Sequence, residues 1–182
     1  MKAVKFLFAA LAMTFAMNAN AQKDDHFVLD AKFGVFTPGS IGGFGVGFGY
    51  QRDLTEFNNF SLAWDVITAE YEAPFNSPAD FGFLSAKTGL RLFSPSFFGD
   101  KWRVYTNLSV GYTCYMLTRD LAYTDAYGNI VYEHDTLKPF HGFGLTFGAG
   151  LQFNQKLSLG YTLQYDTYSK TKNHFATIGW TF

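Results

Sequence analysis

The sequence lacks the features by which many small exported proteins and nucleic-acid-binding proteins are recognised. Its single cysteine, Cys114, excludes an internal disulfide among the 182 residues. Only 16% of the residues are charged and the formal net charge is −1, with no basic cluster, so no nucleic-acid partner is expected. The apolar run at residues 6–17 is shorter than the roughly 18 residues that a transmembrane helix needs. If the chain is exported, something other than cross-links must stabilise it.

The N-terminal segment shows the order of features that defines a secretory signal peptide. Two lysines precede the apolar run, and small residues at Ala19 and Ala21 form a cleavage site. We predict a signal peptide over residues 1–21 and one mature domain over residues 22–182, because the apolar run is too short for a retained anchor. No cysteine lies near the cleavage site to carry a lipid. Removal of both lysines leaves 12 basic residues against 15 acidic ones.

Aromatic residues and glycine are abundant. The chain contains 22 Phe, 11 Tyr and 18 Gly, and 20% of it is aromatic. Soluble domains seldom carry so many rings, whereas a lipid-facing surface with interfacial aromatic belts accommodates them. Glycines fit a crowded barrel interior, so the composition favours a membrane-embedded β-barrel.

From residue 24 onward, apolar residues alternate with small or polar residues, and turn signals interrupt the alternation. A period of two predicts strands, and no sustained helical period occurs. The predicted strands are about residues 26–36, 43–52, 60–66, 84–92, 102–118, 142–153, 157–166 and 173–182. Because bacterial single-chain barrels have an even number of strands, these eight segments predict an all-β, eight-stranded antiparallel up-and-down transmembrane β-barrel.

The connections agree with short periplasmic turns alternating with longer outer loops. The predicted inner turns are residues 53–58, 94–101 and 154–155, and the predicted outer loops are residues 37–42, 71–80, 119–139 and 169–172. Within the longest loop, residues 122–127 and 130–135 flank Gly128-Asn129. This pattern predicts either a hairpin that extends the fifth and sixth strands above the membrane or a mobile loop.

In the last segment Ile178, Trp180 and Phe182 share one face, and Phe182 ends the chain. With the strand pattern, this segment resembles the small outer-membrane barrels of the OmpA/OmpX type. The resemblance implies an outer-membrane location and an assembly signal at these three residues for the barrel-assembly machinery. It also implies outer-membrane lipid and lipopolysaccharide as neighbours. One departure is Thr177, where the signal often has glycine.

A soluble lipocalin-like barrel is the alternative fold, since it also has eight strands and follows a signal peptide. A lipocalin has an apolar interior, whereas the face opposite the rings here carries glycines, charges, hydroxyls and amides. Ring-rich faces turned inward would overfill an eight-stranded barrel. We therefore expect the rings to face lipid.

Charged residues on the opposite face should pair across the lumen, because a buried unpaired charge costs several kcal/mol. We expect Arg91 and Arg103 to pair with Asp30. We expect Lys87 to pair with Asp65. The full predicted lumen set is Asp30, Lys32, Asp65, Lys87, Arg91, Arg103 and Asp166.

Tyr105 and Tyr115 also fall on the inward face, where they would fill the space beside glycines. We therefore favour a lumen plugged by side chains. The alternative is a narrow pore for small solutes.

The resemblance also implies lipid A modification as an alternative, because some barrels of this family are lipid A-modifying enzymes. His141, His174, Ser169 and Asp166 all fall near the outer rim, but the two histidines should face lipid while Asp166 faces the lumen. An enzyme is therefore not expected, and lipid A modification is the last-ranked alternative. The four histidines are scattered, so no metal and no cofactor are expected.

Three tyrosines in the longest loop, Tyr123, Tyr127 and Tyr132, would lie above the membrane. Such rings often mediate contacts with proteins or glycans, and they can equally stabilise their own hairpin. We predict a structural or surface-interaction barrel, with an extracellular protein or glycan as a possible partner.

Overall fold

The computed structural model describes residues 25–37, 41–75, 80–124, 130–136, 139–168 and 170–182. The predicted signal peptide lies outside these ranges, so it stays a prediction. Within them, no helix is long and apolar enough to span a bilayer.

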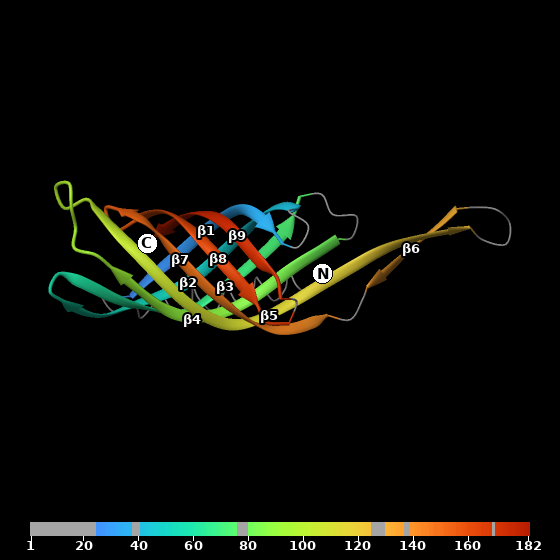
Figure 1. The fold of residues 1–182 in the computed structure, drawn as a ribbon, viewed down its shortest axis with the longest axis horizontal. Coiled ribbons are helices and arrows are strands. Elements are labelled where there is room, and N and C mark those ends of the chain that lie inside the picture. The colour runs from blue at the N-terminus through green and yellow to red at the C-terminus, as the bar shows by residue number, and fades with distance from the viewer. Residues whose placement is uncertain (1–24, 38–40, 76–79, 125–129, 137–138, 169) are drawn as a thin grey trace.

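Nine antiparallel strands make up the described chain, and eight of them close into a barrel (Figure 1). Neighbours pair in the order β4-β3-β2-β1-β9-β8-β7-β5, and pairing of β4 with β5 completes the circle. The predicted all-β, eight-stranded fold is therefore confirmed. The strands are β1 Asp25–Phe36, β2 Ile41–Phe57, β3 Phe60–Pro74, β4 Asp80–Phe93, β5 Trp102–Thr124, β6 Ile130–Thr136, β7 Phe140–Phe153, β8 Leu157–Asp166 and β9 Lys172–Thr181.

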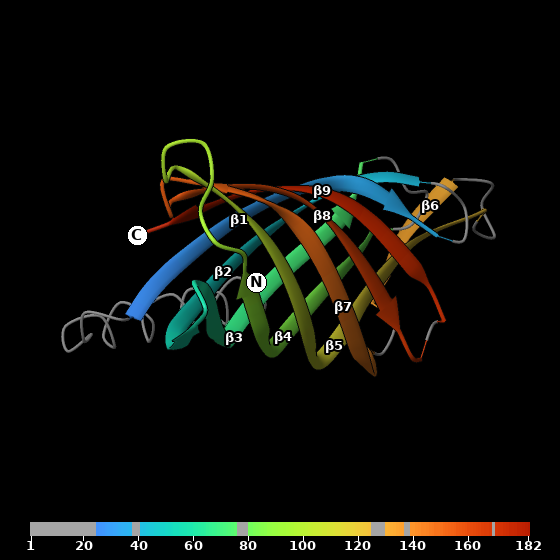
Figure 2. The ribbon, with the colours of Figure 1, turned by 60° about the vertical axis from the view of Figure 1, so that its left-hand side comes forward.

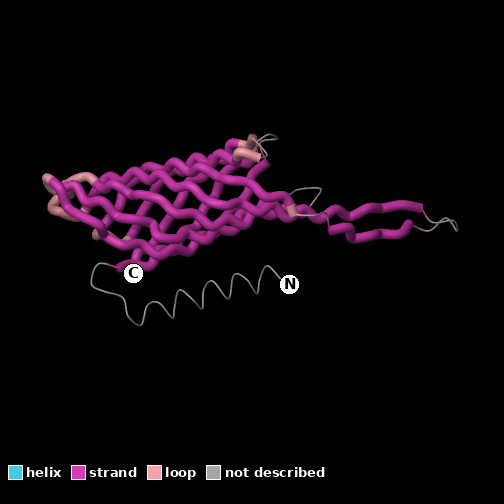
Figure 3. Tube along the Cα trace, turned by 90° about the horizontal axis from the view of Figure 1, so that it is seen from below, coloured by secondary structure: helices cyan, strands magenta, loops and turns pink. Residues whose placement is uncertain are grey.

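The strand outside the barrel is β6. It pairs with residues 118–124 of β5 and forms a hairpin that projects beyond the barrel (Figure 3). Pairing runs from Thr118 opposite Thr136 to Thr124 opposite Ile130. Of the two alternatives that the sequence left open, the structure has the hairpin, and residues 125–129 between its strands lie outside the described residues. β5 is 23 residues long because it serves both the barrel and the hairpin.

One register shift changes the face that β3 presents to the lumen. Tyr50 lies opposite Ile67, but the next residue on β2, Gln51, lies opposite Asp65, so β3 carries one extra residue. This β-bulge reverses the alternation, because a shift of one residue exchanges the two faces of a strand. Asp65 points inward before the bulge, and Glu70 points inward after it. The predicted loop over residues 71–80 was wrong in its start, since β3 continues to Pro74.

The two faces of the wall have the predicted polarity. Leu145 is 46% exposed on the outer surface, whereas the next residue, Thr146, is 3% exposed. The same contrast holds around the barrel. Exposed apolar side chains of the barrel strands include Leu29, Phe33, Val35, Val46, Trp64, Ile67, Leu90, Leu92, Val104, Leu108, Val110, Tyr112, Phe143, Leu145, Phe147, Leu151, Leu159, Tyr161, Ile178 and Trp180.

The connections between β2 and β3, between β4 and β5 and between β7 and β8 lie at the end of the barrel where the C-terminus lies, and the hairpin lies at the other end (Figure 2). Asn58 and Asn59 have φ values of 49° and 66°, and Asn154 and Gln155 have φ values of 49° and 58°. Positive φ at both central residues defines the two-residue hairpin turn whose twist matches its strands. The predicted turn at residues 154–155 is present but one residue longer, because Phe153 at the end of β7 pairs with Leu157 at the start of β8. The predicted turn at residues 53–58 is shorter, because β2 extends to Phe57.

Candidate functional site

The inward side chains form three layers along the barrel axis, of which the outer layer is aromatic. Phe36 stacks on Phe83 with ring centroids 5.2 Å apart, and Phe175 meets Phe36 edge-on at 5.3 Å. Tyr115 adds an edge contact to Phe83 at 4.4 Å. These side chains come from four strands, so together they cover the lumen near the hairpin end.

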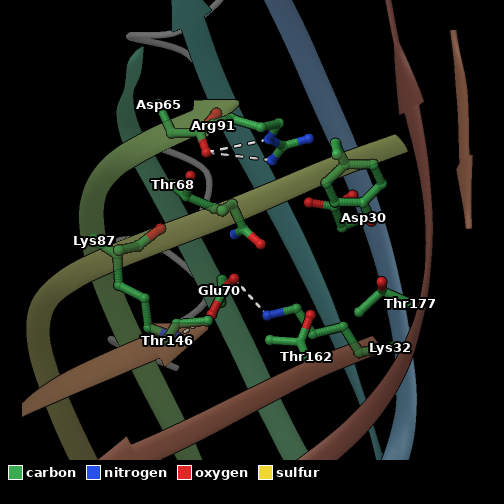
Figure 4. Close-up of a pocket in the computed structure, with 13 residues that line it drawn as sticks. Asp30, Lys32, Asp65, Thr68, Glu70, Lys87, Arg91, Thr146, Thr162 and Thr177 are labelled. Carbon is green, nitrogen blue, oxygen red and sulfur yellow. Dashed lines mark hydrogen bonds and ion pairs between the residues drawn. The ribbon is translucent and has the colours of Figure 1, made fainter. Parts of the chain in front are cut away.

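The middle layer is ionic, and Glu70 is its centre (Figure 4). Nζ of Lys87 donates to Glu70 at 2.5 Å, and Nζ of Lys32 donates to the other carboxylate oxygen. Nε2 of Gln164 donates to Glu70 at 3.2 Å and also to Glu72, which lies 3.4 Å from Nζ of Lys32. This network connects β1, β3, β4 and β8 across the lumen.

A second ionic contact in this layer joins Asp65 to Arg91. Nη2 of Arg91 lies 3.3 Å from Asp65 Oδ2, and Nε2 of Gln51 donates to Oδ1 at 2.8 Å. The guanidinium also lies 5.3 Å from the ring centroid of Tyr105.

The ion pairs differ from those predicted. Arg91 pairs with Asp65 in place of Asp30, and Lys87 pairs with Glu70 in place of Asp65. The cause is the bulge in β3, which places Thr68 opposite Lys87 and turns Glu70 toward it. Diagonal neighbours of this kind are close enough for long side chains to meet.

The inner layer is aromatic again and is capped by Arg103. Phe93 is 1% exposed and packs with Tyr105, and the Arg103 guanidinium lies 3.7 Å from the Phe93 ring centroid. Nε of Arg103 donates to Gln152 Oε1 at 2.6 Å and Nη1 donates to Ser61 Oγ at 3.2 Å. The predicted pairing of Arg103 with Asp30 was therefore wrong, since amide and hydroxyl oxygens take its place.

The remaining lumen charges lie at the ends of the ionic layer. Asp30 lies beside Gly179: a Cβ atom at this position would come within 2.2 Å of Asp30 Oδ1, so a larger residue there would displace the carboxylate. Asp166 accepts hydrogen bonds from Oγ1 of Thr113 at 2.5 Å and from the backbone N–H of Tyr168 at 3.0 Å.

Little space remains between the layers. The larger cavity offers about 30 Å³ to the centres of water molecules and is lined by Asp30, Tyr105 and Thr146, among others. The second offers about 20 Å³ and also borders Thr146. Volumes of this size hold about one or two waters each. Oγ1 of Thr146 is buried without a protein partner in the described structure, so it suits a water ligand.

The candidate catalytic residues lie on different sides of the barrel wall. His141 and His174 face outward, and Nδ1 of each shares a hydrogen bond with a tyrosine hydroxyl. Asp166 is buried in the lumen, and Ser169 lies outside the described residues. The structure therefore does not bring the acid and the histidines together.

No group of three or more metal-ligating side chains occurs within the described residues. Near the inner end of the barrel, Nε2 of His26 lies 3.2 Å from Oδ2 of Asp53, and this contact involves only these two side chains.

No protein-family model and no curated protein matches the chain. Solved structures with a similar fold include Neisserial surface protein A, at 14% identity and a TM-score of 0.58, covering 86% of this chain and 95% of that one. The outer membrane enzyme PagL aligns at 14% identity and a TM-score of 0.55, covering 84% and 98%. Ail, the attachment invasion locus protein of Yersinia pestis, aligns at 14% identity and 0.51, covering 88% and 100%.

The chain has the fold of the small outer-membrane β-barrels. This outer-membrane barrel has the continuous apolar outer surface that hydrocarbon requires and the closed strand ladder that leaves no unpaired edge in lipid. It is an integral protein of the outer membrane. Since the three similar structures include one named as an enzyme and two named otherwise, the shared fold leaves the role undetermined.

Several important lumen residues of this outer-membrane barrel were missed from the sequence. Glu70 and Glu72 follow the bulge, and the alternation of residues does not indicate that the inward face of β3 changes there. Phe36 and Phe93 could have been found, because each continues the inward parity of a charged residue, Lys32 or Arg91, on its own strand.

Proposed function

We propose that this protein is a non-catalytic outer-membrane barrel that carries an interaction hairpin at the cell surface. The observation that carries this proposal is the projection of β5 and β6 beyond a barrel whose interior is filled (Figure 3).

The hairpin has the properties of a docking element. In the described sheet β6 pairs only with β5, so its other edge leaves main-chain N–H and C=O groups unpaired. Such an edge can accept a strand of another protein. In the register of this hairpin, Tyr132 lies opposite Ala122 and Tyr123 lies opposite Val131. Tyr127 lies outside the described residues. An extracellular protein or glycan is the proposed partner.

The filled lumen supports a structural role for the barrel and disfavours a pore. Aromatic layers cover both ends of the ionic layer, and the cavities between them hold only about one or two waters each. A conducting pore would require these layers to separate, which would leave Lys32, Lys87 and Glu70 without their partners.

The position of Asp166 disfavours lipid A chemistry. A nucleophilic mechanism needs its acid within hydrogen-bond reach of the histidine, and here the barrel wall separates the Asp166 carboxylate from His141 and His174. Lipid contacts would then serve to hold the protein in the membrane.

Export and insertion use the two ends of the chain in this proposal. Residues 1–21 act as the cleaved signal peptide. Ile178 and Trp180 on the outer face of β9 and Phe182 directly after it, which are 50%, 43% and 67% exposed, act as the signal for the barrel-assembly machinery.

The test is to replace residues 119–135 with Asn-Gly, which joins the paired residues Thr118 and Thr136 by a two-residue turn. Bacteria carrying this variant should adhere less to epithelial cell layers and aggregate less with one another. The amount of folded protein in the outer membrane should not change. Full adherence and aggregation with the hairpin removed would contradict the proposal.

Pore activity has its own measurement. Wild-type protein in planar bilayers should give no steady open-channel current, and a stable current would refute the closed lumen.

A further inference from the structure

A polar patch lies on the lipid-facing wall where β8 and β9 end below the short outer turn. The side chains of Tyr161 and Tyr165 on β8 and of Lys172 and His174 on β9 share the outward parity. Lys172 lies opposite Tyr165, and His174 lies opposite Leu163. We call these four polar residues the β8–β9 rim patch. Figure 2 shows that this end of the two strands lies away from the C-terminus, at the outer rim.

The imidazole in this patch has a fixed orientation. The Tyr161 hydroxyl shares a hydrogen bond with Nδ1 of His174, and the two ring centroids are 6.0 Å apart. When Tyr161 donates this bond, Nε2 carries the ring proton and is a donor. Nε2 has no partner among the described residues. The same tyrosine-to-histidine arrangement recurs between Tyr112 and His141 on β5 and β7.

The lysine of the patch is anchored to the wall by its backbone. The N–H of Lys172 donates to Oγ1 of Thr37 at 3.1 Å, and the Thr37 hydroxyl donates to the Lys172 carbonyl. The N–H of Thr37 also lies 3.3 Å from Oδ1 of Asn173. The start of β9 is therefore tied to the end of β1, and the ammonium extends from a fixed point.

No carboxylate of the described residues neutralises this patch. The nearest acid along β8, Asp166, points into the lumen toward Thr113. At the opposite end of the barrel, the exposed Arg52 has its own carboxylate partner, Asp25, at 2.7 Å and 3.1 Å. Lys172 has no such partner in the described structure, so it is free to meet a ligand.

The position of the patch along the barrel wall indicates which charged lipid group would lie beside it. Toward the membrane centre, the next outward-facing residues of β9 are Ala176 and then Ile178, which is 50% exposed. Lys172 and His174 therefore lie where the apolar surface gives way to the headgroup region. At this level the outer leaflet of an outer membrane presents phosphorylated glycolipid.

We propose that the β8–β9 rim patch binds the phosphate of a lipid A-type glycolipid in the outer leaflet. The Lys172 ammonium and Nε2 of His174 bind the phosphate oxygens, as cationic and N–H donors do for phosphates generally. Tyr161 and Tyr165 present phenol rings at the interface, where such rings are favoured. This inference does not depend on the hairpin, so either proposal can fail without the other.

The experiment is lipid binding by the full-length mature barrel in detergent micelles, measured by native mass spectrometry. The lipids are bisphosphorylated lipid A, dephosphorylated lipid A and phosphatidylglycerol. We expect one bisphosphorylated lipid A to be retained per barrel. Lys172→Gln should weaken retention about fivefold, since one basic residue near an anionic surface contributes by roughly that factor. His174→Gln should weaken it further, and Lys172→Arg should restore it.

The matched control is Lys156→Gln, which removes an exposed lysine at the opposite end of the barrel. It should leave retention unchanged. Equal retention of dephosphorylated lipid A would overturn the phosphate site, and equal retention of phosphatidylglycerol would overturn the choice of glycolipid. An equal loss in the Lys156 and Lys172 variants would reduce the effect to overall charge and would also overturn the proposal. Unchanged electrophoretic heat-modifiability would verify that each variant is folded.

Discussion

The N-terminal part of β5 belongs to the barrel, whereas its C-terminal part belongs to the projecting hairpin. Residues 105–115 pair with β4 on one edge and with β7 on the other, and their inward side chains join the layered lumen. Residues 119–124 pair only with β6 in the described structure. One strand therefore passes from a region where neighbours surround it on both edges to a two-stranded ribbon, which is marginal alone. This difference indicates that stability resides in the barrel, whereas the hairpin is free to vary and to bind.

The largest effect should come from the centre of the lumen. Glu70→Ala leaves the ammonium groups of Lys32 and Lys87 buried without their shared partner. Breaking a buried ion pair costs about 3–5 kcal/mol, so the free energy of unfolding should fall by that amount in urea titrations of the barrel in lipid vesicles. The control Glu56→Ala removes an exposed carboxylate near the inner turn and should change stability by less than about 0.5 kcal/mol. Equal effects of the two substitutions would mean that the ionic layer does not stabilise the barrel.

A slightly smaller loss is expected from the outer aromatic layer. Phe175→Ala removes a fully buried ring that packs against Phe36, and should cost about 3 kcal/mol in the same titration. Phe98→Ala is the control, because this ring is 83% exposed in an inner turn. If Phe175→Ala were as mild as the control, the outer layer would not be packed as described.

The inner turn of β7 and β8 should show a smaller, conformational effect. Asn154 has a φ of 49°, and alanine in this left-handed region costs about 1–2 kcal/mol. Asn154→Ala should lower the unfolding free energy by about that much, while Asn154→Gly should be tolerated because glycine adopts positive φ without strain. The reverse order of the two variants would show that this turn has another conformation.

The smallest effect on stability should come from removing the hairpin. With residues 119–135 replaced by Asn-Gly, no side chain of the lumen layers is lost. The unfolding free energy should therefore change by less than about 0.5 kcal/mol. A loss as large as that from Glu70→Ala would erase the distinction between the two parts of β5.

The fold could be predicted from the sequence because alternation with a period of two is a local signal. Residues such as Leu145 and Thr146 already differ in polarity, and their opposite placement follows from strand geometry. Asn154 and Gln155 between two alternating segments likewise predicted a tight turn. These features require no knowledge of neighbouring strands.

The lumen partners could not be predicted, because they depend on register between strands far apart in sequence. The bulge near Ile67 inverted the parity of β3 and brought Glu70 to Lys87, a pairing that no local pattern shows. Asp30 had seemed the natural partner for Arg91, but Asp65 is its diagonal neighbour across β3 and β4. The lengths of β2 and β3 were also underestimated, since the C-terminal parts of both strands have mixed polarity.

Site-directed spin labelling in lipid vesicles tests the central claim, that the apolar face of each strand meets hydrocarbon. Nitroxides at Leu145 and Leu159, which are 46% and 43% exposed on the outer wall, should collide readily with oxygen and scarcely with a water-soluble nickel reagent. Labels at Thr146 and Ser158, both buried in the lumen, should be reached poorly by oxygen. Leucine-site labels that respond to the nickel reagent as freely as labels in water would contradict the account.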